Sequence, residues 1–588
     1  MGRQTTLWLC LLVLAIALAA WWQLGRERDE GLGTFDAALL EGLRRERVAA
    51  IHIDHLERGT FHFERDSRGA WYLTDPISYP ADEGVVTVLL DVASQSRATA
   101  VARVERDAQE LGFDPPRAVV TFEERVGEGG GERIVEHRVE LGFLDLDGQR
   151  VNVRRDGRFL RTTRKLHTTI DRSLNDYRSR RVLDLDPRRV AAVDRSGSVQ
   201  FELEGAPIPL DLHAIADGNR WRSLLPEAEL DPLDISLVTV GSAAILVDRF
   251  VDDRAGTLEA LEEYGLAQPE FQVELHTYAG VSEVLGFGRK KPGGAWFLHR
   301  AGWPYVWGVT EEDVLRVTIP FEGLLDRRFA RVARQAVEAL VLRSPAGELR
   351  VARAGGSGGG AEAWTVAADG AAPVPASTAR VEEVLSRLEL MELAGFLLDR
   401  VGPTPELRCE VRLEAGGRAL GGRLGADETD AEGRPALLFQ RLGDEVLALC
   451  DPWLRELCES PLVSWRSLEL LTVAEIDLVG LELTLGAEER RFVRSERGRW
   501  TPAGEEREAL ELLPALDPLL FLRAREHLAQ PGEALEDPIE VRLELRDGSA
   551  RTLVVGRRAG RTLCELEGRR AVLQIEDLHA RLRAAFEE

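Results

Sequence analysis

Two histidines and a carboxylate lie close together in the segment HIDH, residues 52–55. Alternation along an extended strand would place His52 and Asp54 on one face and His55 on the other. A histidine beside a carboxylate could act as the general base that activates a nucleophile. Because no serine or cysteine nucleophile motif accompanies the segment, the pattern favours ordinary strand residues over a catalytic triad.

Three further stretches resemble ligand-binding loops only in part. The DLDG turn, residues 145–148, has the first residues of a calcium loop but lacks the later ligands and the bidentate glutamate. The glycine-rich stretches at 127–133 and 354–362 lack the lysine and the serine or threonine of a phosphate-binding loop. We interpret all three as turns or loop tips, and we expect no metal and no cofactor.

Cysteine could bind a metal, form a disulfide or act as a nucleophile. Apart from Cys10, the cysteines are Cys409, Cys450, Cys458 and Cys564. They include no C-x-x-C pair, and no histidine pattern suitable for zinc lies near them. Buried packing is therefore favoured, with one or two disulfides as the alternative.

Aromatic residues are concentrated in WPYVWG, residues 303–308. Alternation would place Trp303, Tyr305 and Trp307 on one face of a strand. Such a face could pack in a core, or it could be exposed and stack on a ligand.

A basic stretch, GFGRKKPGG at residues 286–294, is a second candidate contact surface. It contains Lys290 and Lys291. A hairpin tip is the simpler interpretation, and contact with an acidic partner or a lipid headgroup is the alternative.

The overall charge narrows the possible partners. The chain has 588 residues and a formal net charge of −25 at pH 7. Because an acidic surface repels phosphate backbones, we expect no nucleic acid partner. The content of hydrophobic residues, 44%, is ordinary for folded protein, and the length predicts several domains.

Residues 7–24 form an uncharged apolar run that is long enough to span a bilayer. Trp21 and Trp22 lie near its end, where an aromatic belt would be. A cleavable signal peptide is the alternative, since ALAAW could be a cleavage site. We expect an uncleaved membrane anchor and a body that lies outside the cytoplasm.

The elements that position all these residues recur four times, at a period of about 140 residues. Each copy starts with an apolar strand that is followed by a tryptophan. The strand starts are Val48, Val190, Val337 and Val473, and the tryptophans are Trp71, Trp221, Trp364 and Trp500. We interpret the tryptophans as core residues between a sheet and a helix, with ligand stacking as the alternative.

After the tryptophan, each copy continues with a helical segment, a loop that contains proline and a hairpin that closes with glycine. The expected apolar helix faces are Val85, Val88, Leu89 and Val92 in the first copy, Val381, Val384, Leu385 and Leu388 in the third, and Ala509, Leu512, Leu513 and Leu516 in the fourth. The second copy is less periodic. The loop prolines are Pro115, Pro269, Pro405 and Pro538, and the closing glycines are Gly142, Gly286, Gly425 and Gly556.

These patterns predict an α+β fold. A single N-terminal transmembrane helix would precede about four tandem repeats, each an antiparallel β-sheet covered by an amphipathic helix. The expected parts are an anchor at 1–30 and repeats at 31–185, 186–333, 334–469 and 470–588.

The first copy resembles the bacterial family called domain of unknown function 4340, or DUF4340. The resemblance rests on the apolar segment, the V-x-x-I-x-I strand from Val48, the W-x-L and P-A-D phrases between Trp71 and Asp82, L-G-F-D-P at 111–115, and the closing Leu-Gly at 141–142. The later copies match more loosely. The resemblance implies a bacterial envelope protein, and with the expected anchor it implies an inner-membrane location and a body that faces the periplasm. Members are in many cases encoded near ABC-type export or gliding-auxiliary transporter components, and the resemblance supplies no catalytic residues.

Two functions of different classes follow from this reading. The first is a membrane-anchored extracytoplasmic scaffold or accessory protein, non-enzymatic, that assists an ABC-type envelope transporter. The alternative is a periplasmic binding module for cell-envelope glycan or peptide, which would use an exposed aromatic face at 303–307. Apolar patches along the repeats would favour the scaffold, and an exposed aromatic face beside a pocket would favour the binding module.

Overall fold

The computed structural model describes residues 37–101, 108–127, 133–201, 205–354, 363–399, 408–528 and 534–586. Within these ranges, no helix has the length and apolar character needed to cross a membrane. Residues 7–24, on which the expected anchor rests, lie outside the described residues. The expectations of membrane attachment, an inner-membrane location and a periplasmic body are corrected accordingly, because the described chain does not support them.

The expected fold class is also wrong, because the described chain is mainly β-structure. Its strands form four antiparallel sheets of nine or ten strands each. The longest helices, α2 (Glu83–Gln95) and α9 (Thr378–Leu390), have only 13 residues. The α+β prediction overestimated the helices because the second half of each copy also consists largely of strands.

The chain divides into two compact units. Unit 1 comprises Met1–Asp211 and Ser236–Ile319, and unit 2 comprises Leu212–Ile235 and Pro320–Glu588. Each unit is described by itself below.

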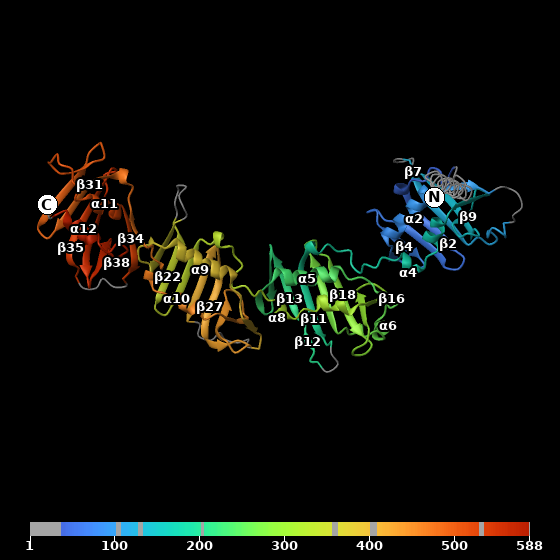
Figure 1. Cartoon of the computed structure of the whole chain (residues 1–588). Coiled ribbons are helices and arrows are strands. Elements are labelled where there is room, and N and C mark those ends of the chain that lie inside the picture. The colour runs from blue at the N-terminus through green and yellow to red at the C-terminus, as the bar shows by residue number, and fades with distance from the viewer. Residues whose placement is uncertain are drawn as a thin grey trace, which may run out of the picture. The chain divides into compact units, whose positions relative to one another are not determined.

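The first sheet lies in unit 1, in the blue-to-cyan part of Figure 1. Its strand order is β1-β6-β10-β9-β8-β7-β2-β3-β4-β5. Its strands are β1 (Ala37–Ala38), β2 (Val48–His55), β3 (Gly59–Arg65), β4 (Trp71–Asp75), β5 (Tyr79–Pro80), β6 (Arg97–Ala100), β7 (Ala118–Val126), β8 (Arg133–Leu144), β9 (Arg150–Arg155) and β10 (Arg158–Thr163). The helices of this part are η1 (Arg45–Arg47), α2, α3 (Arg164–Ile170) and α4 (Leu174–Tyr177).

Helix α2 begins at the P-A-D phrase because the Asp82 carboxylate accepts the Val85 N–H at 2.9 Å, which caps the helix. The predicted apolar face was wrong by a small rotation. The core side of α2 is formed by Val86, Leu89, Leu90 and Ala93. Val88, expected inside, is 47% exposed. The helix carries two neighbouring apolar stripes, and periodicity alone does not choose between them.

The strands of the second sheet are divided between the units. In unit 1 the order is β11-β17-β18-β19-β20-β16, and β12 pairs with β11; unit 2 contains the meander β13-β14-β15. The bounds are β11 (Val190–Val199), β12 (Ile208–Pro209), β13 (Leu212–Asp217), β14 (Arg220–Leu224), β15 (Glu227–Leu230), β16 (Arg249–Asp252), β17 (Phe271–Thr277), β18 (Ser282–Arg289), β19 (Trp296–Arg300) and β20 (Val306–Val309). The helices are η3 (Pro187–Arg189), α5 (Pro232–Ala243), α6 (Leu258–Glu262), α7 (Glu311–Val317) and α8 (Phe321–Leu324).

The third sheet, in unit 2, has the order β24-β23-β22-β21-β26-β27-β28-β29-β25. Its strands are β21 (Ala339–Ser344), β22 (Gly347–Arg353), β23 (Trp364–Ala368), β24 (Val374–Pro375), β25 (Gly395–Leu397), β26 (Cys409–Ala415), β27 (Arg418–Thr429), β28 (Pro435–Arg441) and β29 (Leu447–Cys450). Its helices are η4 (Arg334–Ala336), α9, α10 (Trp453–Cys458) and η5 (Leu462–Trp465). Helix α9 buries Val381, Val384, Leu385 and Leu388, which confirms the predicted face.

The fourth sheet, also in unit 2, has the order β30-β34-β38-β37-β36-β35-β31-β32-β33. Its strands are β30 (Glu469–Thr472), β31 (Leu478–Leu485), β32 (Glu488–Arg494), β33 (Trp500–Pro502), β34 (Phe521–His527), β35 (Glu536–Leu545), β36 (Ala550–Arg558), β37 (Arg561–Leu566) and β38 (Arg569–Leu573). Its helices are η6 (Glu475–Asp477), α11 (Leu513–Leu520) and α12 (Leu578–Ala584). Leu513, expected on the buried face, is the first residue of α11 and is 44% exposed.

Candidate functional site

Three short extended segments connect the successive copies: residues 177–183, 324–330 and 465–471. We call the places where these connecting segments pair with their neighbours joint 1, joint 2 and joint 3. Joint 1 lies in unit 1, and joints 2 and 3 lie in unit 2. Buried charged side chains lie at joints 1 and 2, among them Arg178, Asp326 and Arg441.

Each connecting segment first pairs with the edge strand that precedes the helix of its own copy. The pairing uses two backbone hydrogen bonds at every joint. They are Asp82 N–H to Tyr177 C=O (2.8 Å) and Ser179 N–H to Pro80 C=O (2.9 Å) at joint 1, Asp231 N–H to Leu324 C=O (2.8 Å) and Asp326 N–H to Glu229 C=O (3.0 Å) at joint 2, and Ser377 N–H to Trp465 C=O (2.8 Å) and Ser467 N–H to Pro375 C=O (2.9 Å) at joint 3.

The same segment then pairs with the residues that follow the helix of the next copy. The recurring hydrogen bonds are Val247 N–H to Arg180 C=O (2.7 Å), Leu393 N–H to Arg327 C=O (2.6 Å) and Ala524 N–H to Leu468 C=O (2.7 Å). Each connecting segment is thus hydrogen-bonded on both sides. Antiparallel pairing fixes the register of the paired strands. Each connecting segment therefore holds the edge strand of its own copy and the residues after the helix of the next copy in a defined alignment.

Joint 1 also contains the aromatic residues predicted to share a face. Tyr79, at the edge of the first sheet, is 1% exposed. Its ring centroid lies 5.0 Å from that of Tyr305, 6.0 Å from Trp303 and 6.4 Å from Trp307. Tyr305 and Trp307 are buried and Trp303 is half-buried. Neither Tyr305 nor Trp307 is therefore exposed for stacking on a ligand.

Arg178 closes this aromatic cluster. The residue is 2% exposed, and its guanidinium lies 4.7 Å from the ring centroid of Phe250 and 5.5 Å from that of Tyr79. Its Nη2 donates to Asp253 at 2.6 Å. Burial raises the pKa of Tyr79, so this hydroxyl stays neutral. The cluster combines cation–π and ion-pair contacts in the interior of joint 1.

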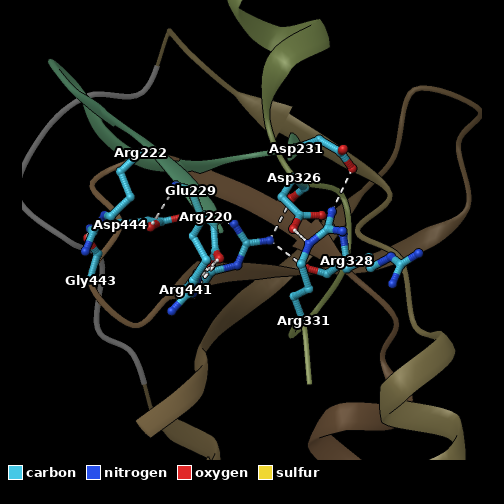
Figure 2. A network of polar contacts seen from close by, with 10 residues as sticks. All are labelled: Arg220, Arg222, Glu229, Asp231, Asp326, Arg328, Arg331, Arg441, Gly443 and Asp444. Atoms are coloured by element: carbon cyan, nitrogen blue, oxygen red, sulfur yellow. Dashed lines mark hydrogen bonds and ion pairs between the residues drawn. The ribbon is translucent and has the colours of Figure 1, made fainter. Parts of the chain in front are cut away.

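Joint 2 is built around Asp326, which is 1% exposed (Figure 2). Its carboxylate accepts Nε of Arg331 at 2.8 Å and the Arg328 N–H at 3.0 Å. Arg331 also reaches Asp231, at 2.8 Å. The hydrogen bond that Arg331 donates to Asp326 raises the pKa of Arg331, so the guanidinium stays charged.

A second buried pair in Figure 2 ties the loop after β28 to the connecting segment. Arg441 Nη1 donates to Asp444 at 3.0 Å, and Nη2 donates to the carbonyl oxygens of Asp326 (2.7 Å) and Arg328 (2.5 Å). Burial raises the pKa of Asp444, and the neighbouring Arg441 opposes that rise. Buried ion pairs of this kind depend on complete hydrogen bonding because both charges have lost their water.

Strand β15, at the edge of the second sheet, is held from two sides. Arg220 forms an ion pair with Glu229, and the Glu229 N–H donates to Asp444 at 3.2 Å. Arg222 Nη2 donates to the Gly443 carbonyl at 2.6 Å. Carboxylates and guanidinium groups of β14, β15 and the loop after β28 therefore satisfy one another.

A pocket of about 310 Å³ lies beside this network. It is lined by Asp217, Arg220, Arg222, Glu229, Phe329, Ala330, Arg418, Ala419, Leu420, Gly421, Arg441, Leu442 and Asp444. Three of its arginines already donate to Glu229, to Gly443 or to Asp444. These three side chains thus contribute hydrogen bonds that fasten joint 2.

The recurring tryptophans do not meet in a common groove. Trp71, Trp364 and Trp500 are 5%, 1% and 2% exposed, and each packs in the core of its own sheet. Trp221 lies on β14 and is half-buried. Burial of three of the four rings is consistent with packing between sheet and helix.

The remaining predicted residues are scattered. Gly142 is required by a close approach, because a Cβ there would lie 2.1 Å from the Leu111 carbonyl oxygen. Lys290 is exposed and pairs with Glu263 at 2.8 Å. The other placements are as follows: Gly286, Gly425 and Gly556 lie on or beside hairpin strands, Pro115, Pro538 and Lys291 are exposed, Pro269 is half-buried, Pro405 lies outside the described residues, and Cys409, Cys450, Cys458 and Cys564 are buried and free.

Sequence reasoning missed the connecting segments. Their shared feature is an apolar residue followed two positions later by serine or aspartate, as in Tyr177 and Ser179. The pattern is short, and the partners lie about a hundred residues away, so spacing along the chain did not reveal the pairing. The signal that could have found it is the recurrence of this triplet just before each new strand start.

A protein-family model matches two overlapping regions of the chain. The family model described as "Domain of unknown function (DUF4340)" matches residues 71–245 and 227–409. No curated protein and no solved structure matches the chain. The two matched regions together span more than half of the 588 residues. The chain therefore belongs to the DUF4340 family.

Proposed function

We propose that this protein is a non-enzymatic scaffold or accessory protein that binds another protein through the outer face of helix α5. The observation that carries the proposal is an apolar stripe on that helix. Leu237 and Val240, both in the part of α5 that belongs to unit 1, are 55% and 47% exposed. Their spacing places them on one side of the helix. Exposed apolar stripes of this kind are typical of surfaces that bind partners.

Helix α9, at the corresponding place in the third copy, carries polar residues where α5 has this stripe. Counted from the residue before each helix, Leu237 on α5 corresponds to Glu383 on α9, and Val240 corresponds to Ser386. Both helices have a buried side, which includes Val238 on α5 and Val384 on α9. The fold thus tolerates polar residues at these outer positions, so packing within the copy does not require Leu237 and Val240 to be apolar.

The joints support the same proposal. Their buried charges and backbone groups are engaged in holding consecutive copies together, as with Arg441 and Asp444 at joint 2. Repeated modules that contact only their neighbours offer long lateral surfaces for partners. A partner with an apolar surface complementary to α5 would fit such a scaffold.

The test uses full-length protein in the cells that naturally produce it. The double variant Leu237→Glu with Val240→Ser gives α5 the residues that α9 carries at the same positions. The matched control is Glu383→Ala with Arg387→Ala on α9. Proteins that co-purify are quantified by mass spectrometry, and the strongest candidate is then purified and its affinity for each variant is measured by calorimetry.

We expect a partner to bind the wild type and the α9 control with the same affinity, and to bind the α5 variant at least about tenfold more weakly. A tenfold loss is what the removal of one to two buried aliphatic contacts should cause. Unfolding temperatures should match among the three proteins. Equal binding to the α5 variant, or turnover of a small molecule by the purified protein, would refute the proposal.

A further inference from the structure

Three polar side chains converge on the surface of unit 1. Asp194 lies on β11, and Glu274 and His276 lie on β17. Asp194 is directly opposite Glu274 in the antiparallel ladder, and His276 is two residues further along the same face. Within the part of the chain that the structure describes, this is the group of three whose ligand atoms all lie within 4.8 Å of one another.

The two carboxylates create a demand for positive charge. Like charges directly opposite each other across a pair of strands destabilise a sheet. Asp194 and Glu274 are both only about one-third exposed, so water screens them incompletely. His276 Nε2 lies 2.8 Å from Asp194 Oδ2 and 3.6 Å from Glu274 Oε1. A cation at this point would relieve the repulsion between the carboxylates.

Ser282 on β18 is hydrogen-bonded to both Glu274 and His276. Its Oγ lies 2.7 Å from Glu274 Oε1 and 2.7 Å from His276 Nδ1. A carboxylate only accepts, so the Ser282 hydroxyl donates to Glu274, and His276 Nδ1–H then donates to Ser282 Oγ. His276 Nε2 is hydrogen-bonded to Asp194 Oδ2 at 2.8 Å, so a bound metal ion would replace the proton between these two atoms and take up the Nε2 lone pair.

The geometry points to a site for a divalent transition-metal ion, and we propose that Asp194, Glu274 and His276 bind Zn²⁺ there. An imidazole nitrogen and two carboxylate oxygens are donors that Zn²⁺ prefers. With bonds of about 2.0–2.1 Å, tetrahedral ligands lie about 3.3 Å apart. The distances of 2.8 Å and 3.6 Å from Nε2 lie on either side of that value.

The three residues leave a fourth tetrahedral position for water or for a group from a partner. Ser282 completes the arrangement because it fixes the tautomer and the orientation of His276, as outer ligands do around protein-bound zinc. The site was invisible to sequence analysis because Asp194 and His276 are 82 positions apart.

The first sheet offers an internal control with one carboxylate fewer. His52 Nε2 lies 3.0 Å from Glu123 Oε1, on strands β2 and β7. The residue directly opposite His52 is Thr121, and the His52 ring stacks on His62 at 3.9 Å. This histidine pairs with a carboxylate without forming a three-ligand group, so it should not bind zinc.

The experiment titrates the untagged full chain with Zn²⁺ by calorimetry and records the visible spectrum with Co²⁺ as the probe of coordination geometry. Variants are His276→Gln, Ser282→Ala and the control His52→Gln. We expect a single Zn²⁺ per chain, no measurable Zn²⁺ affinity in His276→Gln, an affinity roughly 10–100-fold weaker in Ser282→Ala, and no change in His52→Gln. The tetrahedral Co²⁺ absorption should disappear only in His276→Gln.

Circular dichroism shows whether each variant folds, and Glu274→Gln replaces His276→Gln if that variant does not. The proposal is overturned if the wild type binds no Zn²⁺, if the ligand variants bind it as the wild type does, or if His52→Gln loses it equally.

Discussion

Two buried arginines, Arg195 and Arg441, donate hydrogen bonds to backbone carbonyl groups. Arg195 is 3% exposed and donates through Nη1 to the carbonyls of Val317 (3.0 Å) and Ile319 (2.8 Å). Burial lowers the pKa of Arg195 to about 10, which leaves it charged at neutral pH. Arg441 likewise donates to two carbonyls, but it also pairs with Asp444. Replacing Arg441 alone should therefore lower the free energy of unfolding more than replacing Arg441 and Asp444 together.

The first prediction concerns this pair. Arg441→Met should lower the local free energy of unfolding by about 3–5 kcal/mol, because the buried Asp444 carboxylate loses its partner. Arg441→Met with Asp444→Leu should cost clearly less, because no charge remains buried. Hydrogen exchange of β28 amides measures both effects. A double variant that is less stable than the single one would contradict the assignment.

The second prediction concerns pH. His55 is 5% exposed, and its Nδ1 accepts the N–H groups of Glu57 and Arg58, both at 3.2 Å. Burial lowers the pKa of His55 from its ordinary value of 6.5. The folded state thus disfavours the protonated ring, so the contribution to stability is present above pH 6.5 and is lost as the pH falls through the lowered pKa.

Exchange of the Glu57 and Arg58 amides, corrected for the intrinsic pH effect, should therefore become faster between about pH 7.5 and pH 5. His55→Asn keeps an acceptor and removes the titrating group, so its exchange should depend less on pH. If amide exchange depends on pH equally in His55→Asn and in the wild type, titration of His55 does not cause the pH dependence.

At the scale of elements, the connecting segments use the same backbone hydrogen bonds at three joints. Sequence analysis predicted the alternating strands and the α9 face because periodicity along the chain reports burial directly. It placed the α2 face wrongly, since two apolar stripes on that helix compete. It did not find the pairing of Asp82 with Tyr177 or the convergence of Asp194 with His276, because both depend on tertiary contacts.

The third prediction tests a joint. Ser467→Pro removes the N–H that donates to the Pro375 carbonyl, and Arg466 already has the extended conformation that a following proline requires. Loss of this hydrogen bond should cost about 1–3 kcal/mol locally and speed proteolysis between residues 465 and 471. Ser467→Ala keeps the N–H and should be cut at nearly the wild-type rate. Equal cleavage of the two variants would show that the backbone bond does not stabilise joint 3.

The fourth prediction compares two of the recurring tryptophans. Trp364→Ala should cost about 3–5 kcal/mol, because a fully buried ring leaves a cavity in the core of the third sheet. Trp221→Ala should cost less, because Trp221 is half-buried. Hydrogen exchange of β23 and of β14 gives the two values. If Trp221→Ala lowers the free energy of unfolding more than Trp364→Ala does, burial of the ring does not determine its contribution to stability.

At the scale of the whole molecule, joints within each unit hold successive copies together, and α5 presents its apolar stripe outward. Membership of the DUF4340 family agrees with the resemblance seen in the first copy, whereas the membrane anchor and the α+β class did not hold for the described chain. The predicted fold class was wrong because helical periodicity is a local pattern and does not predict how many strands pair in the same copy. The proposed role as a scaffold depends on whether a protein covers α5.

The most direct measurement places a photocrosslinking amino acid at position 237 in the full-length protein, in the cells that naturally produce it. A matched protein carries the same amino acid at position 383, the corresponding position on α9. Illumination should attach a specific protein at position 237, in high yield and at a constant mass, and should attach little at position 383. Crosslinks that are absent at position 237, or equally frequent and diverse at both positions, would contradict the claim that α5 binds a protein partner.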